Sequence, residues 1–177
     1  MNFIYQHQPS VCVEIGTFGG STSFPLLAAL DYLKMGQLTT IDAWNNQEAL
    51  LGLAPNDSNY KWWSQVNFEA VYQSFLVNLV KTHLKNRCKI IRLPSRKAAG
   101  QFEAESIDLL YIDGNFSTNG SLNDVTDYFC KVKSGGYIWL NETRSPAKFP
   151  SITYLMRHTR WLKDESIENR CLVFQKL

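Results

Sequence analysis

The sequence lacks the charge imbalance, the long apolar runs and the clustered cysteines that mark several classes of protein. Its 18 basic and 16 acidic residues give a net charge of only +2, so charge indicates neither nucleic acid nor a membrane surface as a partner. No apolar run approaches the roughly 18 residues of a transmembrane helix. Residues 1–9 lack a basic flank followed by a long apolar run, which predicts no signal peptide and a cytoplasmic protein.

Cysteine is sparse as well. The four cysteines lie far apart, at Cys12, Cys88, Cys130 and Cys171, without the close pairs typical of zinc sites. Three of them fall in predicted strands. We interpret them as buried free thiols in a reducing compartment.

Apolar residues, in contrast, are plentiful. With 177 residues, 45% of them hydrophobic, the chain suits one domain spanning residues 1–177. Short apolar segments alternate with helical periodicity, which predicts an α/β fold with a mostly parallel sheet and helices on both faces. The predicted strands are residues 11–15, 37–41, 87–93, 107–112 and 137–140, with a closing antiparallel pair at 161–167 and 170–175. Helical patterns cover residues 21–36, 61–84, 122–134 and 152–158, and residues 45–60 are predicted to form a polar loop.

Polar side chains follow most of the predicted strands. They are Glu14, Asp42, Ser95, Asp113, Asn141 and Glu142. Open α/β sheets bind ligands beyond the carboxyl ends of their strands, so these side chains mark the expected site. Carboxylates beside buried strands are costly without partners. Several at one edge therefore indicate a site for hydroxyls, amines or a cation.

A glycine-rich segment follows the first strand. Gly16, Gly19 and Gly20 would let the backbone approach a ligand closely. Asp42 lies 22 residues after Gly20, near the offset of about 20 residues that is typical of a ribose-binding acid. This spacing favours a ribose-containing cofactor, the alternative being a plain strand–turn–helix with solvated acids.

Two cofactors with a ribose fit these residues, NAD and S-adenosylmethionine. The pyrophosphate of NAD requires the spacing G-x-G-x-x-G, but the loop from Gly16 reads G-T-F-G-G-S, with its second glycine one residue late. Glu14 precedes the loop, where an acid suits an ammonium group. The pattern therefore favours S-adenosylmethionine, which carries an amino-acid group and a sulfonium instead of phosphates.

These segments together resemble class I S-adenosylmethionine-dependent methyltransferases, specifically the methyltransferase domain 24 group, related in fold to catechol O-methyltransferases. The matching segments are V-E-I-G-T-F-G-G-S-T, T-I-D-A-W, S-I-D-L-L-Y-I-D-G-N-F-S and K-V-K-S-G-G-Y-I-W-L-N-E. They occur in family order and cover most of residues 11–142. The resemblance implies a Rossmann-like, seven-stranded sheet whose antiparallel seventh strand lies between the fifth and sixth.

The resemblance also implies the residues of the site. Glu14 and Gly16 would line the methionine part of the cofactor, Asp42 would bind the ribose, and Trp44 would pack near the adenine or the substrate. The implied cofactor-binding residues are Glu14, Gly16, Thr17, Phe18, Gly19, Ser21, Asp42, Ala43, Trp44, Ser95, Arg96 and Asp113. Asp113 is also the predicted catalytic residue and, with Asn141 and Glu142, the candidate ligand set for Mg²⁺.

Three positions depart from the family pattern. Phe116 replaces a histidine, and a phenylalanine can neither ligate a metal nor act as a base. The pair Asn141–Glu142 replaces two acids, although an octahedral oxygen site completed by waters stays an alternative. Pro94 stands where relatives carry an acid, so recognition of the adenine amine by that carboxylate is lost.

The segment 45–85 connects the second and third strands through the polar loop and the long helix. Tyr60, Trp62 and Trp63 lie beside this loop. They leave two alternatives, a lid or acceptor platform, or packing of an amphipathic helix in the core or in a dimer. The short segment before the first strand leaves the acceptor site either open or closed by a second copy of the chain.

The leading function is methylation of a small-molecule hydroxyl, with sugars and glycosylated metabolites among the candidate acceptors. Such a transfer needs in-line positioning and deprotonation of the acceptor, by a base or a metal. The first alternative, indicated by Phe116 and Pro94, is a non-catalytic S-adenosylmethionine-binding or interaction protein. The second, disfavoured by the glycine spacing, is an NAD-dependent oxidoreductase.

Overall fold

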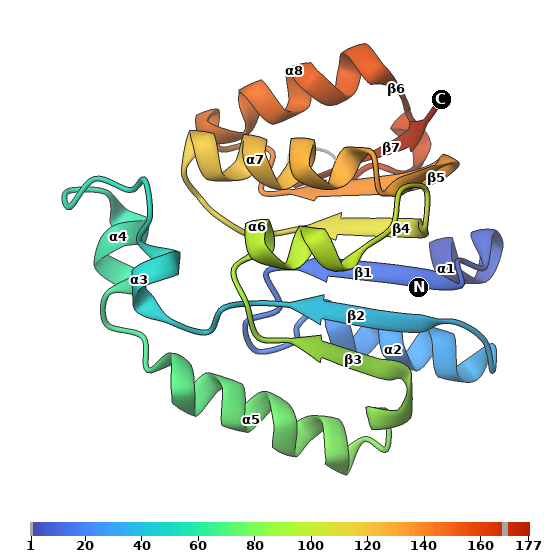
Figure 1. Ribbon diagram of the computed structural model, residues 1–177, viewed down its shortest axis with the longest axis horizontal. Helices are drawn as coiled ribbons and strands as arrows, with labels where there is room; N and C mark the ends of the chain where they lie inside the picture. Colours follow the sequence, from blue (N-terminus) through green and yellow to red (C-terminus); the bar gives the residue numbers. More distant parts are fainter. Residues whose placement is uncertain (1, 168–169) are drawn as a thin grey trace.

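A seven-stranded sheet organises the chain. The computed structural model describes residues 2–167 and 170–177 (Figure 1). The strands are β1 (Val11–Ile15), β2 (Gln37–Ile41), β3 (Cys88–Ile91), β4 (Ile107–Ile112), β5 (Val132–Asn141), β6 (Thr159–Trp161) and β7 (Cys171–Lys176). Their order in the sheet is β3-β2-β1-β4-β5-β7-β6, and β7 pairs antiparallel with both β5 and β6. The predicted Rossmann-like sheet with an inserted antiparallel seventh strand is confirmed.

Helices cover both faces of this sheet. The α-helices are α1 (Asn2–His7), α2 (Ser23–Tyr32), α3 (Asn46–Ala49), α4 (Ser58–Trp63), α5 (Phe68–Lys81), α6 (Ser95–Ala98), α7 (Thr118–Phe129) and α8 (Phe149–His158). One core layer joins Val13 and Ile15 of β1 to residues of α6, α7 and α8. The other joins Cys12 of the same strand to α1, α2 and α5. Alternate residues of a strand face opposite sides, so each face of β1 buries its own layer.

The segment between β2 and β3 differs from the prediction. The expected helix over 61–84 is interrupted, since α4 ends at Trp63 and α5 begins at Phe68. Asn46 holds the break by donating from its side-chain amide to the carbonyls of Trp63 and Val66, at 2.8 and 3.0 Å. The expected loop contains α3, whose first turn is capped by the Asn45 side chain. Helices α3 and α4 lie beyond the carboxyl ends of the strands (Figure 1).

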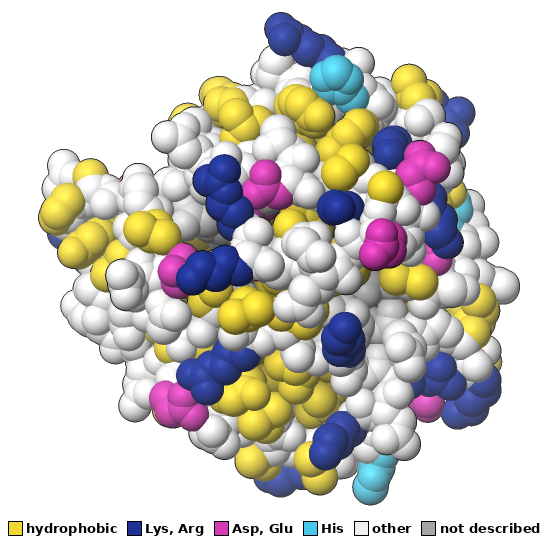
Figure 2. All heavy atoms as spheres, in the orientation of Figure 1, with side chains coloured by type: hydrophobic (Ala, Val, Ile, Leu, Met, Phe, Trp, Pro, Cys, Tyr) yellow, Lys and Arg dark blue, Asp and Glu magenta, His cyan; other side chains and the backbone are white. Residues whose placement is uncertain are grey.

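The predicted strand over 161–167 is wrong: β6 ends at Trp161, and Lys163–Glu165 form a 3-10 helix. Helices α1 and α6 were not predicted, and the other elements differ from the prediction mainly at their ends. Strand β5 begins at Val132, five residues before the predicted start. Cys12 and Cys171 are buried and Cys88 is partly buried, but Cys130 is exposed just after α7, so the prediction of burial is wrong for Cys130. None of the described helices is long and apolar enough to span a membrane. Basic and acidic side chains are interspersed on the face shown in Figure 2.

Candidate active site

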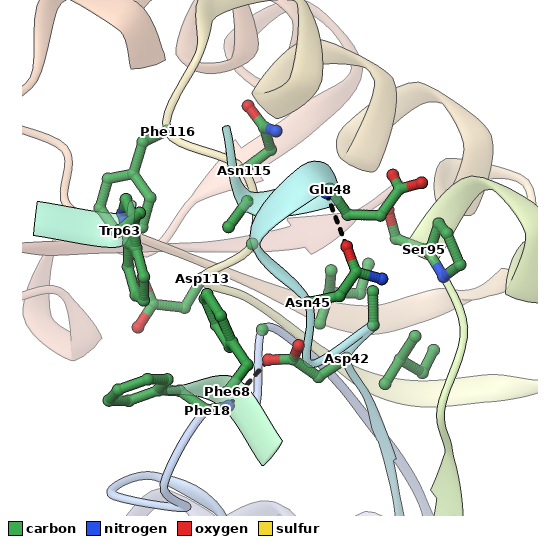
Figure 3. Close-up of a pocket in the computed structure, with 17 residues that line it drawn as sticks. Phe18, Asp42, Asn45, Glu48, Trp63, Phe68, Ser95, Asp113, Asn115 and Phe116 are labelled. Carbon is green, nitrogen blue, oxygen red and sulfur yellow. Dashed lines mark hydrogen bonds between the residues drawn. The ribbon is translucent and has the colours of Figure 1, made fainter. Parts of the chain in front are cut away.

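A cavity of about 700 Å³, open to solvent, lies at the carboxyl ends of the parallel strands (Figure 3). Its walls come from the segments that follow four strands. Gly16 and Phe18 follow β1, Asp42 and Ala43 follow β2, Pro94 and Ser95 follow β3, and residues 113–116 follow β4.

The glycine loop is shaped by the close approach of β1 and β4. Gly16 has a φ of +88°, and a Cβ at this position would collide with the backbone carbonyl of Asp113. Only glycine meets both constraints at the end of β1. At Gly19, in contrast, a Cβ would meet no described atom within 4 Å. The loop therefore needs Gly16 for the backbone geometry, while Gly19 leaves open space.

Asp42 lies in the cavity wall and is tied to the glycine loop. Its Oδ2 accepts a hydrogen bond from the backbone N–H of Phe18 at 2.9 Å, and its Oδ1 accepts one from the N–H of Trp44 at 2.7 Å. Burial raises the pKa of Asp42, and these two hydrogen bonds oppose the rise. Each carboxylate oxygen keeps further acceptor capacity, so Asp42 can also receive hydroxyl donors from the cavity.

Glu14 lies behind the loop instead of in the cavity. Its side chain is 1% exposed and accepts a hydrogen bond from the hydroxyl of Ser23 at the start of α2. Burial, and secondarily the charges of Asp113 and Asp42, raise the pKa of Glu14 to about 8. Glu14 therefore supports the loop from the α2 side, and its prediction as a lining residue is corrected.

Trp44 also differs from the prediction. It is 1% exposed and packs against Tyr72 and Phe75 in the core. Its indole N–H donates to the carbonyl of Phe18 at 2.9 Å. Trp44 therefore fixes the glycine loop from outside the cavity instead of packing on a ligand within it.

The predicted cofactor residues thus divide into two groups. Those that line the cavity are Gly16, Phe18, Asp42, Ala43, Ser95 and Asp113. Those that lie outside its lining are Glu14, Thr17, Gly19, Ser21, Trp44 and Arg96. Within the second group, Glu14 and Trp44 act from outside the cavity. Direct contact of Thr17, Gly19, Ser21 and Arg96 with a cofactor stays a prediction.

Asp113 directly follows β4, which pairs with β5. The side-chain amide of Asn141 donates to its Oδ2 at 3.0 Å. Its Oδ1 is buried and has no hydrogen-bond partner among the described residues. Burial is the main reason that the pKa of Asp113 rises to about 6. One oxygen of Asp113 is therefore held in place, while the other is buried and keeps its acceptor capacity unused among the described residues.

The predicted Mg²⁺ ligands do not form an oxygen cage. Asn141 presents its amide N–H group to Asp113, where a metal ligand would present oxygen. The side chain of Glu142 is exposed. Within residues 2–167 and 170–177, no group of three His, Cys, Asp or Glu residues is placed to hold a metal ion. The side chains of this structure therefore do not fit the predicted magnesium site.

A buried lysine–aspartate network supports the cavity wall and was not predicted from the sequence. Lys148 is 1% exposed, and its ammonium donates to the carbonyl of Asn115 at 3.2 Å. Asp124 accepts from the hydroxyl of Ser95 at 2.5 Å and from the N–H of Asn115 at 3.3 Å. Burial raises the pKa of Asp124 to about 6 and lowers that of Lys148, and the opposite charges limit both shifts. The network fixes Ser95 and Asn115, which both line the cavity.

Aromatic side chains form another wall. Trp63 of α4 lies 5.6 Å from Phe68 in a stacked arrangement, 5.3 Å from Phe18 and 5.5 Å from Phe116, measured between ring centroids. Trp62, its neighbour, is 53% exposed and does not line the cavity. Phe116, which stands where the family pattern has a histidine, therefore serves as an apolar wall opposite Trp63.

Comparison with known proteins agrees with this architecture. The model of a family described as a methyltransferase domain matches residues 13–143. No curated protein matches the sequence. Among solved structures, the O-methyltransferase NovP is 14% identical with a TM-score of 0.74, over 98% of this chain and 74% of NovP.

Two further structures share the fold. CalS11, a TDP-rhamnose 3'-O-methyltransferase of calicheamicin biosynthesis, is 12% identical with a TM-score of 0.61, over 98% of this chain and 76% of CalS11. SMU.1697c from Streptococcus mutans, solved in complex with SAH, is 10% identical with a TM-score of 0.61, over 95% of this chain and 89% of that one. The family match covers well over half of the sequence. The chain therefore belongs to this methyltransferase-domain family, within the class I S-adenosylmethionine-dependent methyltransferases.

Proposed function

We propose that the protein transfers a methyl group from S-adenosylmethionine to a hydroxyl group of a small molecule. The observation that carries this proposal is that Asp42 and Asp113 line one cavity, with Gly16 between them at the end of the intervening strand β1. Asp42 would position the cofactor through its ribose, and Asp113 would deprotonate the acceptor, so the two acids would meet the needs for positioning and for a base. The balanced charge of the chain supports a small-molecule acceptor over a nucleic acid.

The cavity offers a separate surface to each part of the cofactor. Asp42 is placed to accept the ribose hydroxyls, and the segment Pro94–Ser95 lies at the adenine end. The methionine end would extend along Gly16 toward Asp113. Support for this cofactor also comes from the S. mutans neighbour of the same fold, which was solved with SAH.

Glu48 compensates for the acid that is missing after β3. It lines the cavity from α3 and extends toward Ser95 (Figure 3). The backbone N–H of Glu48 is held by the Asn45 side chain at 2.8 Å, which fixes the first turn of this helix. We therefore assign recognition of the adenine amine to Glu48, from a different segment than in relatives with an acid after β3.

Asp113 is the proposed general base. When bound, S-adenosylmethionine would supply a methyl group to the acceptor oxygen and would leave as S-adenosylhomocysteine, with the electron pair of the broken bond on sulfur. Asp113 receives the hydroxyl proton at Oδ1, the oxygen without a partner among the described residues. Asn141 holds the other oxygen and so orients the carboxylate. A carboxylate with a pKa near 6 is mostly ionised at neutral pH and can act as a base.

Turnover and binding together test this assignment. In Asp113→Asn we expect the formation of S-adenosylhomocysteine to fall by about 10²-fold or more, because general-base catalysis contributes factors of this size. We expect the affinity for S-adenosylhomocysteine to change much less. Unchanged turnover in Asp113→Asn would contradict the assigned role. Binding of the cofactor by the wild type without turnover on any acceptor would support the non-catalytic alternative, which the phenylalanine at position 116 favours.

A further inference from the structure

The segment over residues 45–66 forms part of the cofactor cavity but has no buried residue of its own. It contains α3 and α4 and lies beyond the carboxyl ends of the strands (Figure 1). The residues of this segment that line the cavity are Asn45, Glu48, Ala49 and Trp63 (Figure 3). Yet none of residues 45–66, all of which the structure describes, is buried. We call residues 45–66 the lid segment.

Two buried aromatic side chains fix the chain on either side of the lid segment. Trp44, directly before it, is 1% exposed, and Phe68, shortly after it, is 5% exposed. A segment with few buried contacts opens locally at a small cost in free energy, whereas buried side chains are released only when the core opens. The lid segment can therefore detach between Trp44 and Phe68 while the sheet stays folded.

Few contacts hold the lid segment against the rest of the chain. Among the described residues, one hydrogen bond joins the two, from the side-chain amide of Asn115 to the carbonyl of Leu51 at 3.2 Å. The next residue, Gly52, has a φ of +76°, and a Cβ there would lie 2.6 Å from the hydroxyl of Ser117. Glycine thus allows residues 51–52 to approach residues 115–117 closely. Apart from the ring contacts of the lid tryptophans, this close approach is what keeps the lid segment closed.

Asn46 links the two helices of the lid segment. Its side-chain amide donates to the carbonyls of Trp63 and Val66 at 2.8 and 3.0 Å, which ties α3 to the end of α4. With four and six residues, these helices are much shorter than the roughly 12–15 residues at which an isolated helix becomes marginally stable in water. When the lid segment detaches, both helices therefore lose their hydrogen bonds, and Asn46 makes them do so together.

We infer that the lid segment opens to admit the cofactor and closes on its adenosine half. Glu48 and Ala49 belong to the lid segment, whereas Asp42, Gly16 and Asp113 lie at the ends of strands. Only the closed state brings Glu48 and Ala49 to the adenine. A ligand shifts such an equilibrium by the difference between its affinities for the two states. The inference rests on the proposed function, which assigns the adenine amine to Glu48.

Hydrogen–deuterium exchange measures the opening directly. The reporting amides are those of Leu50, Lys61, Ser64 and Gln65, which donate to carbonyls within the lid segment. Without ligand, we expect them to exchange together and faster than the amides of α8. S-adenosylhomocysteine and adenosine, each at about 100 times its dissociation constant, should slow this exchange about 10- to 100-fold, because a ligand stabilises the state that it binds by mass action. The amides of α8, which does not line the cavity, should exchange as before.

Three neighbouring positions of α3 separate the parts of the inference. In Asn46→Ala the link between the helices is lost, so the amides of α3 and α4 should exchange at different rates. In Glu48→Ala the adenine contact is lost, so S-adenosylhomocysteine, at the same multiple of its dissociation constant, should slow the exchange less than in the wild type. Gln47→Ala, at the exposed position between them, should match the wild type in both respects. The amides of α8 report whether each variant stays folded.

Several results would overturn the inference. They are lid amides that exchange as slowly as those of α8 without ligand, bound S-adenosylhomocysteine or adenosine that leaves their exchange unchanged, and undiminished protection in Glu48→Ala. Calorimetry on the same samples separates this failure from that of the proposed function. If S-adenosylhomocysteine binds without slowing the exchange, the lid inference alone fails, whereas the absence of S-adenosylhomocysteine binding removes the proposed function itself.

Discussion

At the scale of single residues, the buried charges explain how the cavity keeps its shape. Lys148 and Asp124 hold Asn115 and Ser95 from behind, and Glu14 holds the start of α2. No pattern in P-A-K-F-P predicts burial of Lys148. The position of Glu14, in contrast, follows from strand alternation. Val13 and Ile15 face one core layer and Cys12 faces the other, so Glu14 lies on the α2 side of β1.

Lys148→Met tests the buried network. Methionine has a similar length but no charge, so Asp113 and Asp124 lose their nearby cation. The ammonium also donates to the buried carbonyl of Asn115. Leaving a buried polar group without its partner typically costs about 1–3 kcal/mol, and we expect the free energy of unfolding in urea to fall by that amount. Lys97→Met, at an exposed position of α6, is the matched control.

The same variant separates charge from packing. Adding Asp124→Asn to Lys148→Met should recover part of the loss, since the uncompensated carboxylate is then removed. The affinity for S-adenosylhomocysteine should fall in Lys148→Met, because Asn115 and Ser95 line its proposed site. A stability loss no larger than that of Lys97→Met would show that the ammonium does not support the wall.

Glu14 predicts a dependence of stability on pH. Its folded pKa of about 8 exceeds the ordinary value of 4.5, so the native state binds a proton that the unfolded state releases. The stabilisation is complete below about pH 4.5 and declines as the pH rises through about 8. Relative to Glu14→Gln, the wild type should lose on the order of 1 kcal/mol of unfolding free energy per pH unit in this window. Parallel pH profiles of the two proteins would contradict the buried, protonated state.

At the scale of elements, the segment between β2 and β3 supplies the part of the cavity that sequence patterns describe least well. Helical periodicity continues across residues 64–67, but the helix is interrupted there because Asn46, about 20 positions earlier, binds the carbonyls of Trp63 and Val66. Such a long-range contact leaves no periodic signal. The strands at 11–15, 37–41 and 107–112 were predicted with their observed bounds, since short apolar strands followed by polar residues are distinct in sequence.

The start of strand β5 also could not be predicted from local sequence. Its first residues include Lys133, Ser134, Gly135 and Gly136, which are typical of a turn. Pairing with β4 nevertheless begins at Val132, with a register irregularity between Ile107 and Leu109. Tertiary pairing therefore extends the strand into a segment whose local composition indicates a loop.

Trp63→Ala tests the aromatic wall contributed by α4. Removing the indole should weaken binding of S-adenosylhomocysteine about tenfold, because one stacking or edge contact with an aromatic ring is typically worth about 1–3 kcal/mol. Trp62→Ala, next to it but outside the lining, should bind as the wild type does. Equal affinities of the two variants would show that α4 does not contact the ligand.

At the scale of the whole molecule, the sheet order brings the segments after β1, β2, β3 and β4 together around the first cavity. The strand order was predicted from the resemblance to the methyltransferase family. The cofactor end of the site was predicted mainly from the polar residues after β1, β2 and β4. A second cavity, on the α2 side of the sheet, could not be predicted, because its walls combine the N-terminal helices with β4, β5 and the start of β7, which lie far along the chain. The predicted magnesium site gains no support, because Asn141 turns its amide N–H group to Asp113, an orientation that a motif does not specify.

Titration calorimetry with S-adenosylmethionine tests the central claim most directly. We predict that the wild type binds it with a dissociation constant in the micromolar range, on the order of −8 to −6 kcal/mol, with no change on adding Mg²⁺. Asp42→Ala should bind at least about tenfold more weakly, and NAD should not bind. The absence of binding at millimolar S-adenosylmethionine, or equally tight binding of NAD, would contradict the account.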